Sequence, residues 1–545
     1  MRALPRFSIV LPLLAVFGLG AVSACAQTPQ APESAASGPA IADDDRPEYW
    51  RVLGQQSLAA ALARPRYENS ARGIILFVGD GMGVSTITAA RIYAGQVDGG
   101  RGEEASLGFE RFPYTSLIKT YNVNQQTPDS AGTMSAMITG VKTDSGLLSV
   151  GPATVRMDCE SGLANSVPTL MEQLEAEGWS TGVVSTARLT HATPAAAYGH
   201  APERGWEDDS ALPKRERGKG CKDLALQLVE MSFGDGLEVA LGGGRRHFLP
   251  SKRSGQPFRD PENPRLTGRR LDGRHLGEEW AARPRSEWIW NQKQFDRIDI
   301  DEVDHLLGTF NHSHMQYELD RENDPGGEPS LSEMTALAIR MLSRNPKGYL
   351  LVVESGRIDH AHHATNAVRA FADTVALDAA VATADAMTED DETLLLVTAD
   401  HSHVMTIAGY ASRGNPILDI VRGNDGRGDA TGEAVLAGDK QPYTTIGYGN
   451  GRGGRFLKKA VDEFGNEAIY GESVNEQRRL NLAEINTMLP GYHQESFIPS
   501  GAETHGGEDV ALFAKGPWAH LVSRTEEQSY IYYVMRHASG IDASE

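Results

Sequence analysis

The stretch GIILFVGDG (73–81) decides the fold, because it is a short, continuously apolar run that ends in Gly-Asp-Gly. Continuous apolar character over so few residues is typical of a strand that is buried on both faces of a parallel sheet. Five more runs have this pattern and carry Gly, Asp, Glu, Ser or His at their ends: STGVVST (180–186), GLEVALGGG (236–244), GYLLVVESG (348–356), TLLLVTADH (393–401) and DVALFAKG (509–516). We therefore predict six buried parallel strands.

Helical patterns lie between these runs, as in VPTLMEQLEAEG (167–178) and AVRAFADTVALDAAVATADAM (367–387). Alternation of strand and helix predicts an α/β fold, with a central, mostly parallel sheet and helices on both faces. In such sheets the ligand site lies beyond the carboxyl ends of the strands. The polar residues that end each run are therefore the candidates for chemistry.

Two regions depart from this alternation. Residues 250–330 are rich in Arg, Asp, Gly and Trp and show little strand signal. Residues 406–500 form a Gly-rich insertion between the fifth and sixth predicted strands. Loops of this length are usually functional, as an interface or a lid.

Composition excludes several classes of protein. With 545 residues, 40% of them hydrophobic, the chain is too long for a disulfide-stapled mini-protein and too apolar for a disordered one. Its 52 basic residues against 73 acidic ones give a net charge of −21. That charge disfavours a nucleic-acid binder held by phosphate contacts.

The first 25 residues have the features of an export signal. Arg2 and Arg6 form a basic start, and an apolar core follows at 7–22. We predict an exported protein, either periplasmic or attached to the cell envelope. After residue 25 no stretch reaches the 18 apolar residues that a membrane span needs.

Two processing routes remain open at the end of this signal. Cleavage could follow Ala26, whereas Val22-Ser23-Ala24-Cys25 resembles a lipobox that would attach lipid to Cys25. We favour the lipobox, because residues 26–45 are rich in Pro, Ala and Ser and would then form a tether. The remaining cysteines, Cys159 and Cys221, are a candidate disulfide in an exported protein, with two buried free thiols as the alternative.

Candidate metal ligands follow the fourth and fifth predicted strands. In ESGRIDHAHH (354–363), Glu354 ends a strand, and Asp359 and His363 are spaced so that one helical turn could direct both at one ion. An Asp and His pair suits zinc, although a solvated polar turn is the alternative. TADHSH (398–403) adds Asp400 and His401, and we interpret His403 as a surface histidine.

Asp80 and His505 complete the candidate set. GDGMG (79–83) lacks the third glycine of a dinucleotide-binding loop, and Asp80 taken alone is more often a helix N-cap than a ligand. His505, in ETHGGED (503–509), precedes the last predicted strand. Four carboxylates and three histidines at four strand ends are enough for two or three divalent ions, and two such ions could clamp a phosphoryl group.

The candidate nucleophile is Ser130, in TPDSAGTMSAMITG (127–140). Pro128-Asp129-Ser130 predicts a helix start, where the helix N-terminus favours an anion. No G-x-S-x-G elbow accompanies Ser130, so activation by a metal is favoured over a serine-hydrolase triad. Arg204 could bind phosphate in a bidentate manner. The alternatives are a capping serine and a surface ion pair.

These residues belong to longer motifs that resemble those of the alkaline phosphatase family, in its vertebrate-like branch. The motifs occur in the family's order and the likeness runs from Arg46 to Ile541: FVGDGMGVSTITAARI, RFPYTSLIKTYNV, TPDSAGT, VESGRIDHAHH, LVTADHSHV and ETHGGEDVALFAKGPWAHLV. The resemblance implies a catalytic domain over 46–545 that contains the insertion. It also implies hydrolysis of phosphate monoesters at alkaline pH through a phosphoserine, with two zinc ions, one magnesium ion and a homodimer.

The resemblance assigns roles position by position. Ser130 matches the nucleophile and Arg204 the phosphate-binding arginine. The first zinc site is matched by Asp359, His363 and His505, the second by Asp80, Asp400 and His401, and the magnesium site by Asp80, Thr193 and Glu354. Asp129, His191 and His360 fall beside the phosphate. Cys159 and Cys221 match a family disulfide.

Two departures from the family pattern stand out. The 406–500 insertion takes the place of the vertebrate crown subdomain but is longer. The vertebrate calcium site is matched only in part, which leaves a fourth ion open: Glu279 and Phe310 are in place, Asn311 replaces a glutamate, and Asp324 or Glu328 supplies the last ligand.

Two rival functions are weighed against this one. A phosphodiesterase or nucleotide pyrophosphatase could use the same two-metal core, but Arg204 suits the additional charged oxygen of a monoester. A non-catalytic exported lipoprotein that binds phosphate or metal has no need of Ser130.

Overall fold

The computed structural model describes residues 46–255, 259–453, 457–461, 467–471 and 481–541. It separates a unit that ends at Arg64 from a compact unit over Pro65–Glu545. In the first unit, helix α1 (Pro47–Leu62) has no buried residue. The predicted export signal, the predicted lipobox at Cys25 and the predicted 26–45 tether lie outside the described residues.

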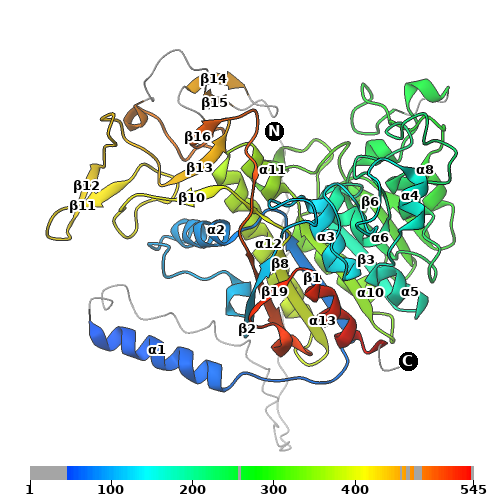
Figure 1. Cartoon of the computed structure of the whole chain (residues 1–545), viewed down its shortest axis with the longest axis horizontal. Helices are drawn as coiled ribbons and strands as arrows, with labels where there is room; N and C mark the ends of the chain where they lie inside the picture. The colour runs from blue at the N-terminus through cyan, green and yellow to red at the C-terminus, as the bar shows by residue number, and fades with distance from the viewer. Residues whose placement is uncertain (1–45, 256–258, 454–456, 462–466, 472–480, 542–545) are drawn as a thin grey trace, which may run out of the picture. The chain divides into compact units, whose positions relative to one another are not determined.

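The compact unit is built on a ten-stranded sheet in the order β19-β2-β18-β8-β1-β7-β3-β4-β6-β5 (Figure 1). Strand β1 lies between β7 and β8, runs parallel to both and is buried along its whole length. The strands are β1 (Gly73–Gly79), β2 (Tyr114–Lys119), β3 (Ser180–Arg188), β4 (Val239–Gly243), β5 (Ser286–Ile289), β6 (His305–Thr309), β7 (Tyr349–Ser355), β8 (Thr393–Ala399), β18 (Val510–Lys515) and β19 (Thr525–Glu527). The mostly parallel central sheet is confirmed.

All six predicted strands are present, but the prediction of their direction is wrong for the last one. Strand β18 runs antiparallel to both β8 and β2. A continuous apolar run reports burial on both faces and carries no information on direction. Burial alone therefore could not separate β18 from its parallel neighbours.

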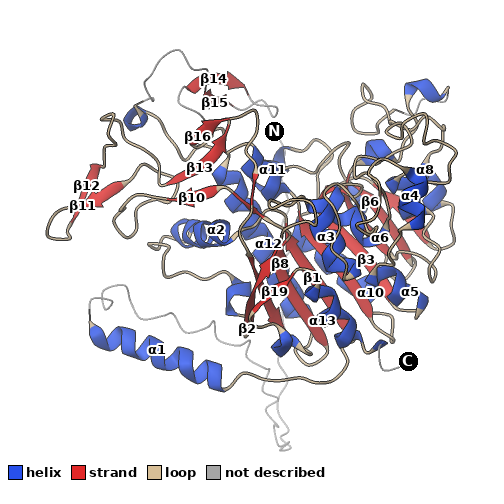
Figure 2. Ribbon diagram, in the orientation of Figure 1, coloured by secondary structure: helices blue, strands red, loops and turns tan. Residues whose placement is uncertain are grey.

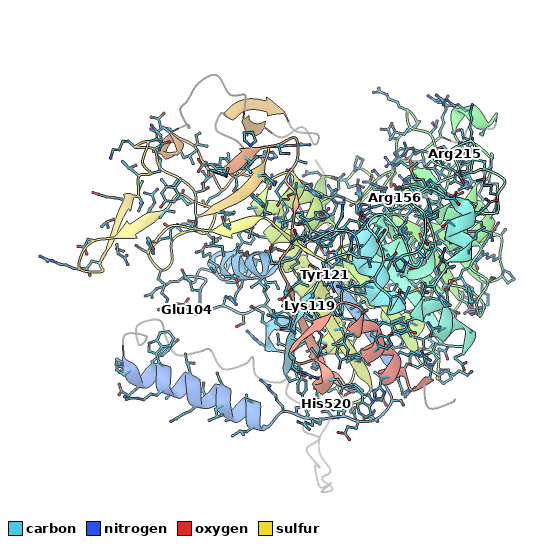
Figure 3. All side chains as sticks on the ribbon, viewed as in Figure 1. Glu104, Lys119, Tyr121, Arg156, Arg215 and His520 are labelled. Atoms are coloured by element: carbon cyan, nitrogen blue, oxygen red, sulfur yellow. A yellow bond between two sulfur atoms is a disulfide. The ribbon has the colours of Figure 1, made fainter. Side chains whose placement is uncertain are left out.

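Four strands gave no clear signal in the sequence. Strands β5 and β6 lie within 250–330, where little strand was expected, and they are only four and five residues long. Strands β2 and β19 form one edge of the sheet, where exposed and buried side chains mix. Lys119 of β2, labelled in Figure 3, pairs there with Glu527 of β19 at 2.9 Å.

Helices cover the sheet on both faces (Figure 2). Helix α12 has the predicted bounds and packs against α10 and α2, while α3 packs against α6 and α13. The α-helices of this unit are α2 (Val84–Val97), α3 (Ser130–Thr139), α4 (Cys159–Ala164), α5 (Leu170–Ala176), α6 (Ala192–Tyr198), α7 (Leu224–Val229), α8 (Leu276–Ala281), α9 (Gln292–Phe295), α10 (Leu331–Leu342), α11 (Arg357–His363), α12 (Ala367–Met387) and α13 (Tyr530–Ser539). Short 3₁₀ helices are η2 (Gly108–Arg111), η3 (Arg245–His247), η4 (Lys252–Ser254), η5 (Glu318–Asn323), η6 (Leu482–Glu484) and η7 (Ala519–Leu521).

The chain between β8 and β18 forms small sheets of its own. A three-stranded sheet joins β10 (Met405–Ile407), β13 (Ile446–Gly451) and β16 (Ser496–Pro499). Two antiparallel pairs accompany it: β11 (Arg422–Asn424) with β12 (Ala430–Ala434), and β14 (Leu457–Val461) with β15 (Glu467–Gly471). The insertion is bracketed by β9 (Ser402–His403) and β17 (His505–Gly506), which pair with each other.

Two further sequence features can be placed. Cys159 and Cys221 form a disulfide with a Cα–Cα separation of 5.7 Å, so the predicted pairing is confirmed. Among the described residues, no helix has the length and apolar character that crossing a bilayer requires.

Candidate active site

Three buried carboxyl groups gather at the carboxyl ends of three adjacent strands. Asp80 follows β1, Glu354 lies near the end of β7, and Asp400 follows β8, and all three side chains are inaccessible to solvent. The predicted grouping at this edge of the sheet is therefore present. Asp80 is not a helix cap, because helix α2 starts at Val84 with Gly83 as its N-cap.

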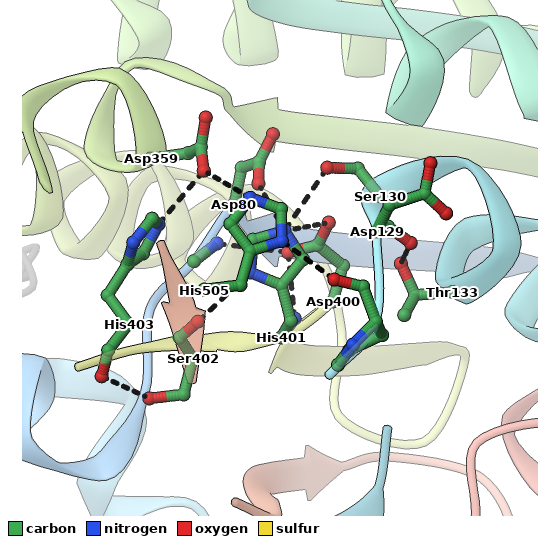
Figure 4. A network of polar contacts seen from close by, with 12 residues as sticks. Asp80, Asp129, Ser130, Thr133, Asp359, Asp400, His401, Ser402, His403 and His505 are labelled. Carbon is green, nitrogen blue, oxygen red and sulfur yellow. Dashed lines mark hydrogen bonds and ion pairs between the residues drawn. The ribbon is translucent and has the colours of Figure 1, made fainter. Parts of the chain in front are cut away.

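Asp80, Asp400 and His401 form one compact group (Figure 4). His401 Nε2 lies 3.4 Å from a carboxylate oxygen of each aspartate, and its Nδ1 donates to the Ser402 carbonyl at 3.2 Å. That hydrogen bond leaves the Nε2 lone pair facing the carboxylates. Both Asp80 oxygens and Asp400 Oδ2 are buried without a hydrogen-bond donor.

The buried carboxylates of Asp80 and Asp400 require a compensating positive charge. Burial, and then the charge of Asp400, raise the pKa of Asp80 well above its usual range. Burial likewise raises the pKa of Asp400. A divalent cation between the two carboxylates would remove this repulsion and satisfy the unpaired oxygens. Asp80, Asp400 and His401 therefore fit a zinc ion.

A second group centres on Asp359 in helix α11. His363, one turn later, and His505 from β17 place their Nε2 atoms 3.2 and 3.4 Å from Asp359 Oδ1 and 3.1 Å from each other. Each ring uses Nδ1 to donate to a backbone carbonyl, that of Glu503 for His363 and that of Pro128 for His505. Two Nε2 lone pairs thus converge on one carboxylate, which fits a second zinc ion.

His403 is buried beside this group, so its interpretation as a surface histidine is wrong. Its two nitrogens lie within hydrogen-bond distance of carboxylates, Nδ1 at 2.5 Å from Glu503 and Nε2 at 2.9 Å from Asp359. Burial opposes the charged form, but Glu503 and Asp359 outweigh it and raise the pKa of His403 to about 10. With both nitrogens against carboxylates, His403 holds Asp359 and Glu503 in place beside the second group.

Close packing around His403 explains one glycine of the GDGMG motif. Gly81 adopts a φ of +70°, and a Cβ there would lie 2.4 Å from the His403 ring. Its backbone N–H donates to Asp400 Oδ1 at 2.9 Å. Gly81 therefore lets the chain after β1 approach both His403 and the metal ligands.

A third group contains Asp80, Glu354 and His191. Glu354 Oε1 and the hydroxyl of the predicted ligand Thr193 are both buried without a hydrogen-bond partner. The Ser185 hydroxyl donates to the other Glu354 oxygen, while burial raises the pKa of Glu354 to about 7. Oxygen ligands from Asp80, Thr193 and Glu354 fit a magnesium ion, and Ser185, missed in the sequence, positions Glu354.

Ser130 lies at the first position of helix α3, directly beside the Asp80 group. Its hydroxyl oxygen is 3.2 Å from His401 Nε2, and the helix N-terminus is capped by Asp129, which accepts from the Gly132 N–H at 3.1 Å. Helix α3 thus directs its positive end at the candidate metal ligands beside the Ser130 hydroxyl. The predicted helix start is present, and the capping residue is Asp129, not Ser130.

Arg204 reaches the same place from the loop after α6. Its guanidinium donates to Asp129 Oδ2 at 3.1 Å and lies 3.4 Å from His191 Nε2. His191, His360 and His314 form a cluster of rings, with centroids 4.0 Å apart for His314 and His360. Burial lowers the pKa of all three rings, so they stay neutral, and His314 was not identified from the sequence.

The residues expected for calcium are only partly brought together. Asn311 donates to Glu328 at 2.7 Å and lies 3.5 Å from Asp324. Burial, followed by the charge of Asp324, raises the pKa of Glu328 to about 8. Glu279 forms an ion pair with Arg274, and the carboxyl group that acts on Glu328 in addition to that of Asp324 is the Glu262 carboxyl group.

Buried carboxylates, imidazole lone pairs, a serine at a helix N-terminus and an arginine together define a metal-dependent hydrolase of phosphate esters. The family model for alkaline phosphatase matches residues 71–541. The chain belongs to the alkaline phosphatase family and hydrolyses phosphate monoesters.

Known relatives span nearly the whole chain. It is 42% identical to the tissue-nonspecific isozyme of Felis catus over 91% of this chain and 89% of that protein. It is 39% identical to the alkaline phosphatase of Gadus morhua over 91% of this chain and 98% of that one. The solved alkaline phosphatase of Thermus thermophilus has a TM-score of 0.59 at 24% identity, covering 89% and 95% of the two chains, and shows the same fold.

The charge on His403 gives a pH-dependent prediction for the protein freed of metal. Because the folded-state pKa lies above the ordinary 6.5, its stabilisation is complete below pH 6.5 and is lost as pH rises to about 10. Titration of His403 should lower the free energy of unfolding of the parent protein by about 1.4 kcal/mol per pH unit across that window, and we expect His403→Gln to remove this slope. Urea unfolding in chelator measures it. An exposed control, His537→Gln, keeps the slope, and an unchanged slope in His403→Gln would contradict the assignment.

Proposed function

We propose that hydrolysis proceeds at alkaline pH through a phosphoserine at Ser130. The observation that carries this proposal is the position of the Ser130 hydroxyl, 3.2 Å from His401 Nε2 and at the positive end of α3. The Ser130 hydroxyl is therefore adjacent to the proposed zinc group of Asp80, Asp400 and His401. Arg204, held by Asp129, is available for the phosphoryl oxygens.

In the first step the Ser130 hydroxyl gives up its proton and its oxygen attacks phosphorus. The bond between the Ser130 oxygen and phosphorus forms, the bond between phosphorus and the ester oxygen breaks, and the leaving oxygen takes up a proton. In the second step a water oxygen attacks the phosphoserine, the serine–phosphorus bond breaks, and inorganic phosphate is released. Arg204 holds two non-bridging oxygens through both steps. Two in-line displacements give net retention at phosphorus. An alkaline optimum follows because a hydroxyl and then a water must each lose a proton.

The metal assignment is part of the same proposal: zinc at Asp359, His363 and His505, zinc at Asp80, Asp400 and His401, and magnesium at Asp80, Thr193 and Glu354. When bound, these ions would lower the pKa of the attacking hydroxyl groups and offset charge on the phosphoryl oxygens. The support is the unpaired buried oxygens of Asp80, Thr193, Glu354 and Asp400. A calcium ion at Asn311, Asp324 and Glu328, with Glu262 in place of Glu279, is the corrected form of the fourth site.

Assembly and substrate range extend the proposal. The resemblance supports a homodimer, with the 406–500 insertion in the place of the crown. We infer that small phosphate monoesters are the substrates, since Arg204 and the metal groups would contact only the phosphoryl group. The natural ester is left open.

Replacing Ser130 tests the covalent route. We expect Ser130→Ala to lower kcat on nitrophenyl phosphate by on the order of 10³-fold or more, because the nucleophile is removed. Zinc and magnesium content, measured by mass spectrometry, should stay the same. Ser135→Ala on the same helix is the matched control, since Ser135 donates to the Ala131 carbonyl and faces no ligand. Undiminished turnover in Ser130→Ala would exclude the phosphoserine.

The ratio of monoester to diester hydrolysis tests the rival phosphodiesterase. We expect the protein loaded with zinc and magnesium to prefer nitrophenyl phosphate over its bis-ester strongly at alkaline pH. Arg204→Ala should reduce the monoester rate more than the diester rate, because the monoester offers one more charged oxygen. A ratio near or below one would move the enzyme to the diesterase class.

Export and anchoring remain a proposal that rests on residues 1–45. We expect the protein expressed in a bacterial host to incorporate labelled fatty acid and to sediment with membranes. Cys25→Ser should abolish both, because the acceptor thiol is lost. A mature protein that begins after Ala26 and stays in the soluble fraction would instead establish ordinary signal cleavage.

A further inference from the structure

A second acidic cluster lies at the opposite end of the sheet from the catalytic groups. It consists of Glu175 at the end of α5, Asp235 in the loop before β4, and Glu238 directly before β4. One carboxylate oxygen of each residue lies within 4.8 Å of the others. The cluster is at the amino ends of β3 and β4, whereas the catalytic ligands follow the carboxyl ends of parallel strands.

Glu175 supplies a buried oxygen with no partner. Its side chain is only 1% exposed, and one oxygen accepts from the Thr181 hydroxyl at 2.6 Å. The other oxygen, Oε2, has no hydrogen-bond donor. A Cβ added to Gly234 would lie 2.4 Å from this oxygen, so Oε2 faces the loop that carries Asp235. An unpaired carboxylate oxygen is costly to bury unless a ligand satisfies it.

Glu238 and the backbone hold the cluster in place. Glu238 Oε2 accepts from the Thr181 N–H at 2.7 Å, so Thr181 positions both glutamates. Burial, and then the charge of Glu238, raise the pKa of Glu175 to about 9. Burial also raises the pKa of Glu238 to about 7. The side chains of Glu175 and Glu238 are also hydrogen-bonded to each other, so a proton between them offsets part of the repulsion within the cluster where no cation is bound. The remaining repulsion requires a positive charge.

The nearby arginines do not supply that charge. Arg285 pairs with Asp304 at 2.6 Å, Arg344 donates to the Val303 carbonyl at 2.9 Å, and Arg283 donates to the Val229 carbonyl. The nearest cationic candidate is His305, whose Nε2 is 3.8 Å from Asp235. Among the described residues, no lysine or arginine pairs with Glu175, Asp235 or Glu238.

We propose that Glu175, Asp235 and Glu238 bind a calcium ion at the amino ends of β3 and β4. Three carboxylates form an all-oxygen donor set, which suits hard cations, and calcium accepts irregular geometry and water ligands. Asp235 and Glu238 line a surface cavity of about 1040 Å³ through which the ion and its waters enter. The ion joins α5 to the loop before β4, and so stabilises the amino-terminal ends of β3 and β4, remote from the catalytic groups.

Calcium titration of the holoenzyme, with zinc and magnesium saturating, tests this proposal. We expect Glu175→Gln/Glu238→Gln to bind one calcium ion fewer by calorimetry, or to bind it roughly tenfold or more weakly. The rise in Tm that calcium causes in the parent protein should shrink accordingly. Glu177→Gln removes an exposed acid of the same segment and should bind calcium as the parent does. Glu328→Gln removes the separate acidic group near Asn311 and should leave this site intact.

Terbium, a luminescent substitute for calcium, locates the ion. Trp179 lines the same cavity, so it should sensitise terbium emission, and Trp179→Phe should lower that emission while calcium binding persists. Equal calcium binding by the parent and the double variant would overturn the proposal. So would an equal loss in Glu177→Gln, since this would indicate diffuse surface charge. The outcome is independent of the Ser130 chemistry.

Discussion

Repulsion among Asp80, Glu354 and Asp400 is the constraint on which the rest of the site depends. Parallel pairing of β1 with β7 and β8 fixes these carboxyl groups at one edge of the sheet, where water is excluded. Such an arrangement is stable only when cations or protons compensate it. The imidazoles of His363, His401 and His505 are held by backbone carbonyls with their lone pairs inward, which selects metal ions for that role.

A second layer of residues sets the geometry of the ligands. His403 bridges Asp359 and Glu503, Ser185 holds Glu354, and Asp129 joins the cap of α3 to Arg204. The same aspartate therefore orients both the helix that carries Ser130, the proposed nucleophile, and Arg204, which we propose binds the phosphoryl group. Catalytic position and phosphate recognition are coupled through one side chain.

The sequence was sufficient for the strands of the sheet centre and for the ligands that follow them, because continuous apolar runs and polar strand ends are local signals. It was insufficient for β18, since direction depends on which neighbours a strand finds, and for β5 and β6, which are short. His403 was misplaced because burial of a histidine depends on remote partners, here Glu503. Glu503 lies in the quoted motif ETHGGED, two residues before His505, and that spacing was the available signal. Glu279, expected in the calcium set, pairs with Arg274, a contact that the resemblance to the family did not indicate.

The reversed direction of β18 has a consequence for how the enzyme is made. Because β18 is antiparallel to β8, its amino end lies at the edge where the other strands have their carboxyl ends, and this brings His505 to Asp359. The ligands thus come from both ends of the catalytic unit, from Asp80 to His505. During synthesis the ribosome must release nearly the entire chain before the proposed zinc group of Asp359, His363 and His505 is complete. Metal loading of that group is therefore a late event in biogenesis, and Asp359 lacks its partner His505 until the C-terminal segment docks.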